Sequence, residues 1–563
     1  MSPRPNTSFP AGKFNLPPAL EPFAPWAVAA FKLLVSVFFV YSYVDRYIRV
    51  MYIADGPARG IEAYRLAFAG FRLFPQHQFA PLPLWLWAAL LKIVPDIYFT
   101  GTALNVVAGA GVAAFIYLLG RKLAGSLGGA VAAAAYIFSP VHHNLTLSEG
   151  MAEPTFYLFL TAGIYLTAVG ADAEDNRGWW GAGFLFAAAA RCRYEAALFL
   201  LLYAGYRLVR GRPARWHEWL AWAAPLALAG VFLAAKAFQP HSRGLWPALG
   251  GVHADTSRVL TNPVWYRRLG YGVWRMLFDG RATTVLGFAG AALVFGRRRT
   301  AGALVEWGAW AVIFAALTVI AVAVGVGFCP ERYFATPLLL LFPFTGLAVV
   351  HIAEGMTTPI KKIAGTAVLV AAALITARWD ATILKPGYGY QGPSETRPTF
   401  AAETALTLRE LWRRGELGPE ELVLIEKGDR LNEEYPLRAY TDHPLNFERV
   451  TSSDLRLKLE GLTLYMNQKR FRVAIILSVE NRAAFQRYYA EQETGTVIFE
   501  NPTHTIVVRP DGWRHIPPFT SRVRPDISAV YEITPGRATE TKPVPGAPGP
   551  KTPPPSPVKP SRP

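Results

Sequence analysis

The sequence predicts a polytopic α-helical membrane protein of about 11 transmembrane helices with a small extracytoplasmic α/β domain near its C-terminus. Of its 563 residues, 52% are hydrophobic and only 17% are charged, and the mean hydropathy is positive. Apolar runs close to the ~20 residues that a helix needs to cross a bilayer recur through positions 26–380. Because only helices and closed barrels satisfy all backbone groups in lipid, these runs predict membrane-spanning helices.

The predicted spans are separated by short polar breaks. They are 26–44, 97–119, 126–141, 154–170, two spans within 179–209, then 217–236, 283–296, 304–328, 334–352 and 363–379. The segment 179–209 is too long for one helix, and charged residues from Arg191 to Glu195 interrupt it, so we interpret it as two helices. The Pro-rich residues 1–25 are expected to form a disordered leader ahead of this transmembrane domain.

Basic residues predict the orientation of the chain. Short loops rich in Lys and Arg face the cytoplasm when the N-terminus lies inside, as the positive-inside rule requires. This orientation places two long loops, 45–96 and 237–282, at the outer face of the cytoplasmic (inner) membrane. The net charge of +17 fits arginine-rich loops beside lipid, and no nucleic-acid partner is inferred from it.

Residues 395–533 have a mixed composition that predicts an α/β domain on the outer face. The runs 422–429 and 472–479 have the pattern of buried strands, and 495–510 has that of a hairpin turning at Asn501-Pro502. Helical stretches are expected at 402–415 and 481–492. The tail 534–563 is rich in Pro, Gly, Lys and Ser and is expected to be disordered.

Acidic residues at the outer membrane boundary are candidates for chemistry on a hydroxyl group. Asp55 and Glu62 lie in the first outer loop, where the alternative role is that of an ordinary solvated carboxylate. Glu149 and Glu153 lie four apart at the start of a span. Glu153 also suits a helix N-cap, a role compatible with function, and acidic groups at the membrane boundary are expensive to keep without one.

Histidines and arginines near these carboxylates suggest an anionic or metal ligand. His142 and His143 together with the two Glu residues leave room for a divalent metal, although interfacial packing or a hydrogen bond to sugar or phosphate is the favoured explanation. No cofactor is required by the sequence. Arginines at helix breaks or ends suit an anionic ligand, and pairing with Glu195 or another buried acid is the alternative. These candidates are Arg191, Arg193 and Arg332-Tyr333, with Arg243 and its aromatic neighbours in the long loop as further candidates.

Five segments in this order carry a resemblance to a known family. They are IEAYRLA (61–67), APLPLWLWAALLKI (80–93), SEGMAEPTFYLFL (148–160), RCRYEA (191–196) and ERYFATPLLLL (331–341). The chain resembles, over residues 26–380, the GT-C polyprenyl-phosphate-sugar-dependent glycosyltransferases of the protein mannosyltransferase and aminoarabinose transferase group.

The resemblance implies an enzyme that moves a sugar, with inversion, from a polyprenyl-phosphate donor to a lipid, glycan or protein acceptor beside membrane lipids. It implies that Glu62 or Asp55 is the base, that Glu153 is a second carboxylate, and that Tyr64 and Arg65 bind substrate. It also implies that the anion held by the arginines is a lipid phosphate and that Arg243 lies on the acceptor side.

One position departs from the family pattern. Such proteins commonly show Asp-Glu-Ala-Tyr in the first loop, whereas Ile61 occupies the Asp position here and only Glu62 remains. Either Glu62 has taken the role, or Asp55 supplies it, or the chemistry differs. A transporter or flippase of lipid-linked saccharide and a non-catalytic lipid-sugar-binding protein are the alternative functions. Ionisable residues that cluster at one face, without a clear internal repeat, favour the enzyme.

Overall fold

The computed structural model describes most of the helical region and parts of the C-terminal region. The described residues are 16–46, 55–71, 80–148, 150–173, 176–193, 196, 201, 205, 209, 215–237, 265–296, 302–323, 332–361, 363, 365, 367, 397–427, 431–451, 471–477, 496–500 and 505–508. Most of the predicted span 363–379, the second half of 179–209, the helical stretch 481–492 and the tail 534–563 lie outside them.

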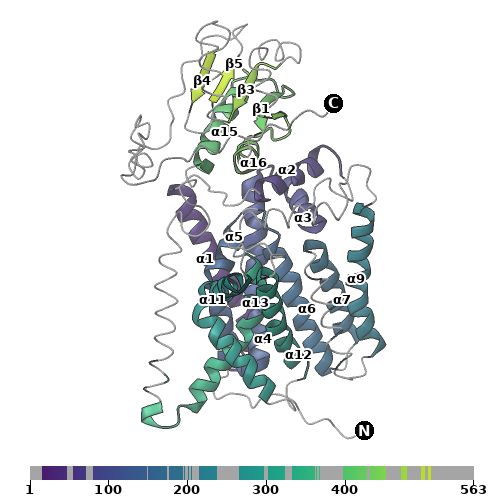
Figure 1. The fold of residues 1–563 in the computed structure, drawn as a ribbon, viewed down its shortest axis with the longest axis vertical. Coiled ribbons are helices and arrows are strands. Elements are labelled where there is room, and N and C mark those ends of the chain that lie inside the picture. The colour runs from purple at the N-terminus through teal and green to yellow at the C-terminus, as the bar shows by residue number, and fades with distance from the viewer. Residues whose placement is uncertain are drawn as a thin grey trace, which may run out of the picture. The chain divides into compact units, whose positions relative to one another are not determined.

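Long helices occupy the predicted spans wherever the chain is described (Figure 1). One helix also extends into a predicted loop, because residues 265–282 of the loop 237–282 are helical and continue into the span 283–296. They are α1 (Ala24–Arg46), α4 (Ile97–Ile137), α6 (Glu153–Ala173), α7 (Asn176–Cys192), α9 (Trp216–Ala237), α11 (Trp265–Gly296), α12 (Gly302–Ala323) and α13 (Arg332–Gly355). A short 3-10 helix, η1 (Glu21–Phe23), precedes α1 within the predicted leader. Three described segments are both long and apolar enough to cross a membrane: Glu21–Val40, Ile97–Ile137 and Phe334–Gly355.

The bundle is centred on α4, α6 and α13. Helix α13 packs against both α4 and α11, while α6 packs against α4 and α7. Aliphatic and aromatic side chains with almost no exposed surface fill the interior, as the hydrophobic runs predict. Examples are Val112, Tyr136, Phe156, Leu160, Phe334 and Leu338.

Helix α4 is a hairpin of two helical halves. Ala124 and Gly125 leave the helical conformation, and the φ of Gly125 is 73°, which a side chain would disfavour. The halves approach so closely that a Cβ added to Gly129 would lie 2.7 Å from the carbonyl oxygen of Tyr117. The break falls where the sequence predicts the gap between spans 97–119 and 126–141.

The segment between α1 and α4, predicted as the first outer loop, contains two helices, α2 (Asp55–Phe68) and α3 (Pro81–Leu91). Pro81 occupies the first position of α3, where its missing N–H costs no hydrogen bond. Both helices bury apolar side chains in one cluster, and Trp87 at its centre donates from Nε1 to Thr100 Oγ1 at 2.9 Å. The loop is therefore a packed layer joined to the start of α4.

The segment after α4 differs from the sequence prediction. The polar break between the predicted spans 126–141 and 154–170 is expected to be a turn, but Pro140–Leu147 form the short helix α5, and both of its histidines are buried. Its polar sequence shows no apolar periodicity, so its burial comes from the surrounding helices α1, α4, α6 and α13.

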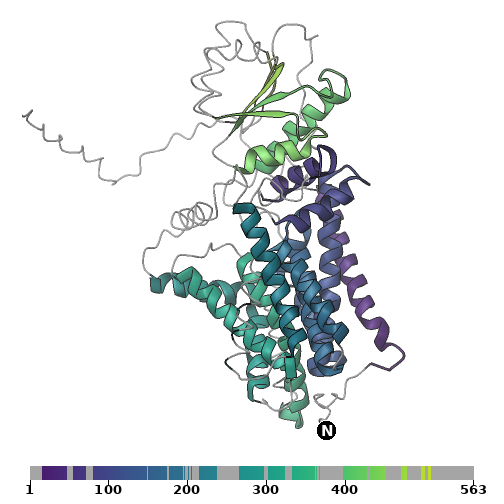
Figure 2. The same cartoon turned by 90° about the vertical axis from the view of Figure 1, so that its right-hand side faces the viewer.

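The C-terminal region contains a five-stranded mixed sheet (Figure 2). Its elements are α15 (Arg397–Arg413), β1 (Val423–Lys427), α16 (Leu431–Tyr440), β2 (Phe447–Thr451), β3 (Val473–Ile476), β4 (Thr496–Glu500) and β5 (Thr505–Val508). The strand order is β2-β1-β3-β5-β4, with β1 parallel to β2 and β3, and β5 antiparallel to β3 and β4. Strands β1 and β3 and the β4–β5 pair lie where the sequence predicts them, whereas α16 and β2 were not predicted.

Helix α16 contacts the membrane-side helices. The rings of Tyr98, at the start of α4, and Tyr440, at the end of α16, stack with centroids 4.0 Å apart. The Tyr98 hydroxyl donates to the carbonyl of Pro436 at 3.3 Å. Ala439 and Tyr440 are part of the buried cluster of α2, α3 and α4, so α16 packs against α2 and the start of α4.

Candidate active site

Three charged residues lie on one face of α2. Arg59, Glu62 and Arg65 are spaced three apart, which places them in successive turns of the same helical face. Glu62 is only 1% exposed, and its Oε2 accepts a hydrogen bond from Nη1 of Arg65 at 2.7 Å. The side chain of Arg65 is partly exposed. A buried carboxylate held by an arginine is therefore built into the segment between α1 and α4.

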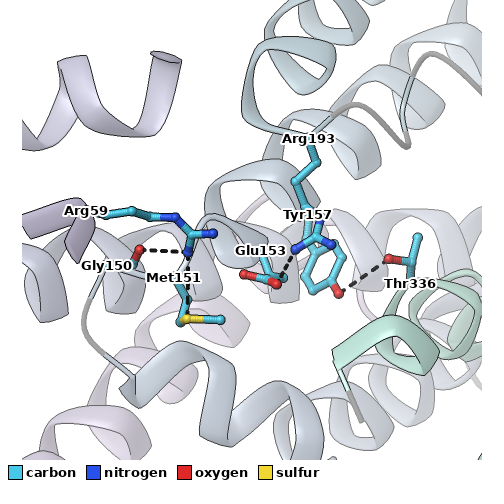
Figure 3. A network of polar contacts seen from close by, with 7 residues as sticks. All are labelled: Arg59, Gly150, Met151, Glu153, Tyr157, Arg193 and Thr336. Atoms are coloured by element: carbon cyan, nitrogen blue, oxygen red, sulfur yellow. Dashed lines mark hydrogen bonds and ion pairs between the residues drawn. The ribbon is translucent and has the colours of Figure 1, made fainter. Parts of the chain in front are cut away.

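Arg59 joins α2 to the loop that precedes α6. Its Nη1 donates to the carbonyl of Gly150 at 3.3 Å and lies 3.8 Å from Sδ of Met151 (Figure 3). Gly150 has a φ of +65°, and a Cβ there would lie 2.1 Å from Cζ3 of Trp87. Only glycine fits this backbone against the indole. The carbonyl is thereby held in front of Arg59.

A second buried carboxylate opens α6. Glu153 is fully buried and forms an ion pair with Arg193, which directly follows the end of α7 (Figure 3). The side chain of Arg193 is 13% exposed. Of the two roles considered for Arg193, the structure shows pairing with a buried acid. The acid is Glu153, so the charged break after α7 and the acidic start of α6 form one site.

Tyr157 extends this network toward α13. It lies one turn after Glu153, and its hydroxyl is 3.5 Å from Oγ1 of Thr336 (Figure 3). The preceding carbonyl, that of Ala335, lies 3.0 Å from Nε2 of His142, whose Nδ1 is 2.9 Å from Oγ of Ser139. Because Nε2 must donate to a carbonyl, Nδ1 accepts from the hydroxyl. Helices α5, α6 and α13 thus meet through defined polar contacts.

These contacts leave the His142 ring without a nitrogen for a metal. His143 faces Lys32 of α1 instead, with Nδ1 at 3.3 Å from Nζ. Among the described residues no group of three or more His, Cys, Asp or Glu side chains is arranged to hold a metal ion. Glu149, the other acid considered for such a site, lies outside the described residues.

The remaining predicted residues are more dispersed. The hydroxyl of the half-buried Tyr64 points at the carbonyl of Asp442, 3.5 Å away, and burial together with the Asp442 charge raises the pKa of Tyr64. Arg191 lies in the last turn of α7 and is partly buried. Asp55 and Arg332 are the first residues of α2 and α13, but their side chains, that of Tyr333, and the whole of Arg243 lie outside what the structure describes.

Arg281 is a residue that sequence reasoning did not select. It lies inside α11 at a kink, is 8% exposed, and has a φ of 49°, a conformation uncommon for a residue with a side chain. Gly280 beside it packs against Leu338 of α13. Strained backbone at a buried charge is frequent at functional sites. The only sequence signal for Arg281 is its position as a single arginine just before the apolar run 283–296. Arg59 was equally inconspicuous.

Comparison with known proteins identifies the fold. A model of the family described as dolichyl-phosphate-mannose-protein mannosyltransferase matches residues 78–241. The structure is similar to that of ArnT from Cupriavidus metallidurans bound to undecaprenyl phosphate, with a TM-score of 0.55 and 12% identity, covering 86% of this chain and 97% of that one. For ArnT in the apo state the TM-score is 0.57 at 11% identity, with coverages of 85% and 97%. No curated protein matches the sequence.

These likenesses confirm the predicted fold class. The chain is a multi-pass helical membrane protein with the GT-C fold, and the resemblance inferred from the five sequence segments is confirmed.

Proposed function

We propose that this protein is an integral-membrane GT-C glycosyltransferase that moves a sugar from a polyprenyl-phosphate-linked donor to an acceptor at the outer face of the cytoplasmic membrane. One observation carries the proposal. Two buried carboxylates, Glu62 and Glu153, each form an ion pair with an arginine. Arg59 connects the two pairs, because it lies on the helix of Glu62 and donates a hydrogen bond to the loop just before Glu153. The fold is shared with a protein whose crystal structure contains undecaprenyl phosphate, and one span of the chain matches a mannosyltransferase family.

The chemistry needs few groups. In an inverting transfer the acceptor hydroxyl attacks the anomeric carbon while the bond from that carbon to the phosphate oxygen breaks, and polyprenyl phosphate leaves with the electron pair. Glu62 takes the proton of the attacking hydroxyl, a contribution that is typically worth 10²–10⁴ in rate. Arg65 holds that carboxylate in place. Asp55, at the start of the same helix, is the alternative base.

Cationic side chains stabilise the departing phosphate. Arg59 and Arg281 are the candidates. Arg59 contacts the loop that precedes Glu153, and Gly280, the neighbour of Arg281, packs against α13. Glu153, anchored by Arg193, serves as the second carboxylate and orients the sugar or the acceptor. The transporter alternative is not favoured, because both comparisons lead to glycosyltransferases.

The test measures transfer of radiolabelled sugar from synthetic polyprenyl-phosphate donors. Purified wild type, Glu62→Gln, Asp55→Asn and Glu153→Gln are each incubated with a membrane extract, whose lipid, glycan and protein fractions are then counted separately. We expect label in one fraction with wild type and its loss with Glu62→Gln. Glu354→Gln, an exposed carboxylate at the far end of α13, is the matched control. A wild type that binds donor but never consumes it contradicts the proposal.

A further inference from the structure

Helix α1 buries a cation inside the bundle. Its outer face exposes large apolar side chains such as Phe31, Leu34 and Phe38, as expected of a helix beside lipid, whereas Lys32 on the other face is completely buried. A lysine at this position is costly to bury, and ionisable residues within membrane helices generally have a function.

The contacts of Lys32 include no counter-ion. Its Nζ is 3.3 Å from Nδ1 of His143 on α5 and 5.6 Å from the centroid of the Tyr136 ring on α4. Within the described part of the chain no carboxylate forms an ion pair with this ammonium. An ammonium has three N–H donors. The imidazole and the aromatic face use part of that capacity, and no carboxylate among the described residues compensates the charge.

Two further polar groups lie beside this ammonium with hydrogen-bonding capacity to spare. The His143 ring also contacts the ring of Phe39 at 4.6 Å, so it spans the two turns of α1 between Lys32 and Phe39. Ser36 lies in that interval, one turn after Lys32. Its Oγ and Nε2 of His143 are both buried and make no hydrogen bond to any described residue. Buried polar atoms normally have partners, so these two are unusual.

The protonation states make all three groups donors. A charged Lys32 donates to Nδ1 of His143, which places the imidazole hydrogen on Nε2. The hydrogen-bond donors that have no partner among the described residues are the other N–H groups of Lys32, the hydroxyl of Ser36 and Nε2–H of His143. A ligand that satisfies them must supply several acceptor oxygens and a negative charge, which a phosphate does and a sugar does not.

We propose that Lys32, Ser36 and His143 form a binding site for the phosphate of a lipid ligand, on the α1 side of α5. The ligand class follows from the proposed function, in which a lipid phosphate is both donor and product. The site uses none of the residues assigned to the carboxylate centre. A purely structural contact between helices, with a neutral lysine amine, would still leave Ser36 Oγ and Nε2 of His143 unsatisfied.

Direct binding tests the site separately from catalysis. Radiolabelled polyprenyl phosphate is titrated onto the full-length protein in detergent, for wild type, Lys32→Met, Lys32→Arg and Ser36→Ala. Loss of one charged hydrogen-bonding group predicts an affinity about 10- to 100-fold weaker for Lys32→Met. Ser36→Ala should weaken binding less, and Lys32→Arg should retain most of it. Lys361→Met, at an exposed position after α13, is the control and should bind like wild type.

Competition identifies the source of the phosphate. Unlabelled polyprenyl phosphate, polyprenol, phosphatidylglycerol and inorganic phosphate are each added in excess. Displacement by polyprenyl phosphate but not by polyprenol supports the site, and displacement by phosphatidylglycerol assigns it to phospholipid headgroups instead. Melting temperatures verify that each variant is folded. Wild-type affinity in folded Lys32→Met and Ser36→Ala overturns the proposal even if sugar transfer is observed, whereas reduced affinity supports it even if no transfer is detected.

Discussion

Glu153, the first residue of α6, is paired with Arg193, the residue after α7, so the junction between two helices of the bundle is also the candidate active site. The carboxylate is fully buried, and the pair lies among helices that pack closely on each other. Stability and chemistry therefore depend on the same ion pair, and substitutions there are expected to affect both.

Arg193→Met should lower the melting temperature strongly, because it leaves the buried charge of Glu153 without this arginine. Breaking one partner of a buried pair costs about 3–5 kcal/mol. The double variant Glu153→Gln/Arg193→Met removes both charges and should melt at a higher temperature than Arg193→Met alone. Thermal unfolding in detergent measures the series. Additive effects of the two substitutions would show that the pair is not coupled.

Glu62→Gln should reduce kcat by about 10²–10⁴ while leaving donor affinity nearly unchanged, because only the proton-accepting group is removed. Single-turnover transfer and donor binding, measured on the same preparation, separate the two quantities. Glu354→Gln should match wild type in both. If Asp55→Asn loses kcat by this amount while Glu62→Gln stays fully active, the base is Asp55 at the start of α2.

Gly150→Ala should destabilise the protein and abolish transfer, because its Cβ would collide with Trp87 and displace the loop that leads into Glu153. Overpacking of this kind costs about 1–3 kcal/mol, in addition to the strain of a positive φ. Gly415→Ala is the matched control. Its φ is +73°, but nothing lies within 4 Å of the added Cβ. Melting temperatures should fall more for Gly150→Ala; an equal fall would mean that backbone strain alone is responsible.

Tyr98→Leu should loosen the contact between α16 and the start of α4. The substitution removes a stacked ring pair and the hydrogen bond to the Pro436 carbonyl, worth together about 1–3 kcal/mol. Amide hydrogen exchange in Leu431–Tyr440 should become faster while that in α13 stays unchanged. Tyr266→Leu, which alters an exposed ring on α11, should change neither.

The parts of the fold that could be predicted from sequence are those with a strong local signal. The apolar runs of α1, α6 and α9 predict their positions within a few residues, and the basic pair Arg121-Lys122 after the span 97–119 predicts the turn of α4. Strands β1 and β3 contain short continuous apolar runs, VLI and VAII, typical of buried parallel strands. By contrast, the sequence of α16 contains Pro436 and three charged residues, and its burial depends on neighbours that are distant in the chain.

The candidate site was predicted in part. Glu62, Glu153 and Arg193 were selected because acids and arginines at a membrane boundary are conspicuous. Their pairing was not foreseen, since α6 and α7 bring Glu153 and Arg193 together only after packing. Arg59 and Arg281 resemble ordinary loop cations in sequence, and Lys32 is a single lysine within an apolar span. Only their burial and contacts distinguish them.

The hairpin of α4 affects the order of assembly during synthesis. Its closest contacts, such as Tyr117 with Gly129, join residues near in sequence, so they require little loop-closure entropy and can form early. The segment that contains α5 and Glu153 leaves the ribosome immediately afterwards. Arg193, Arg281 and α13 arrive later. The hairpin can therefore serve as a template on which the later helices assemble, and a defect at Gly125 should appear first as failed biogenesis.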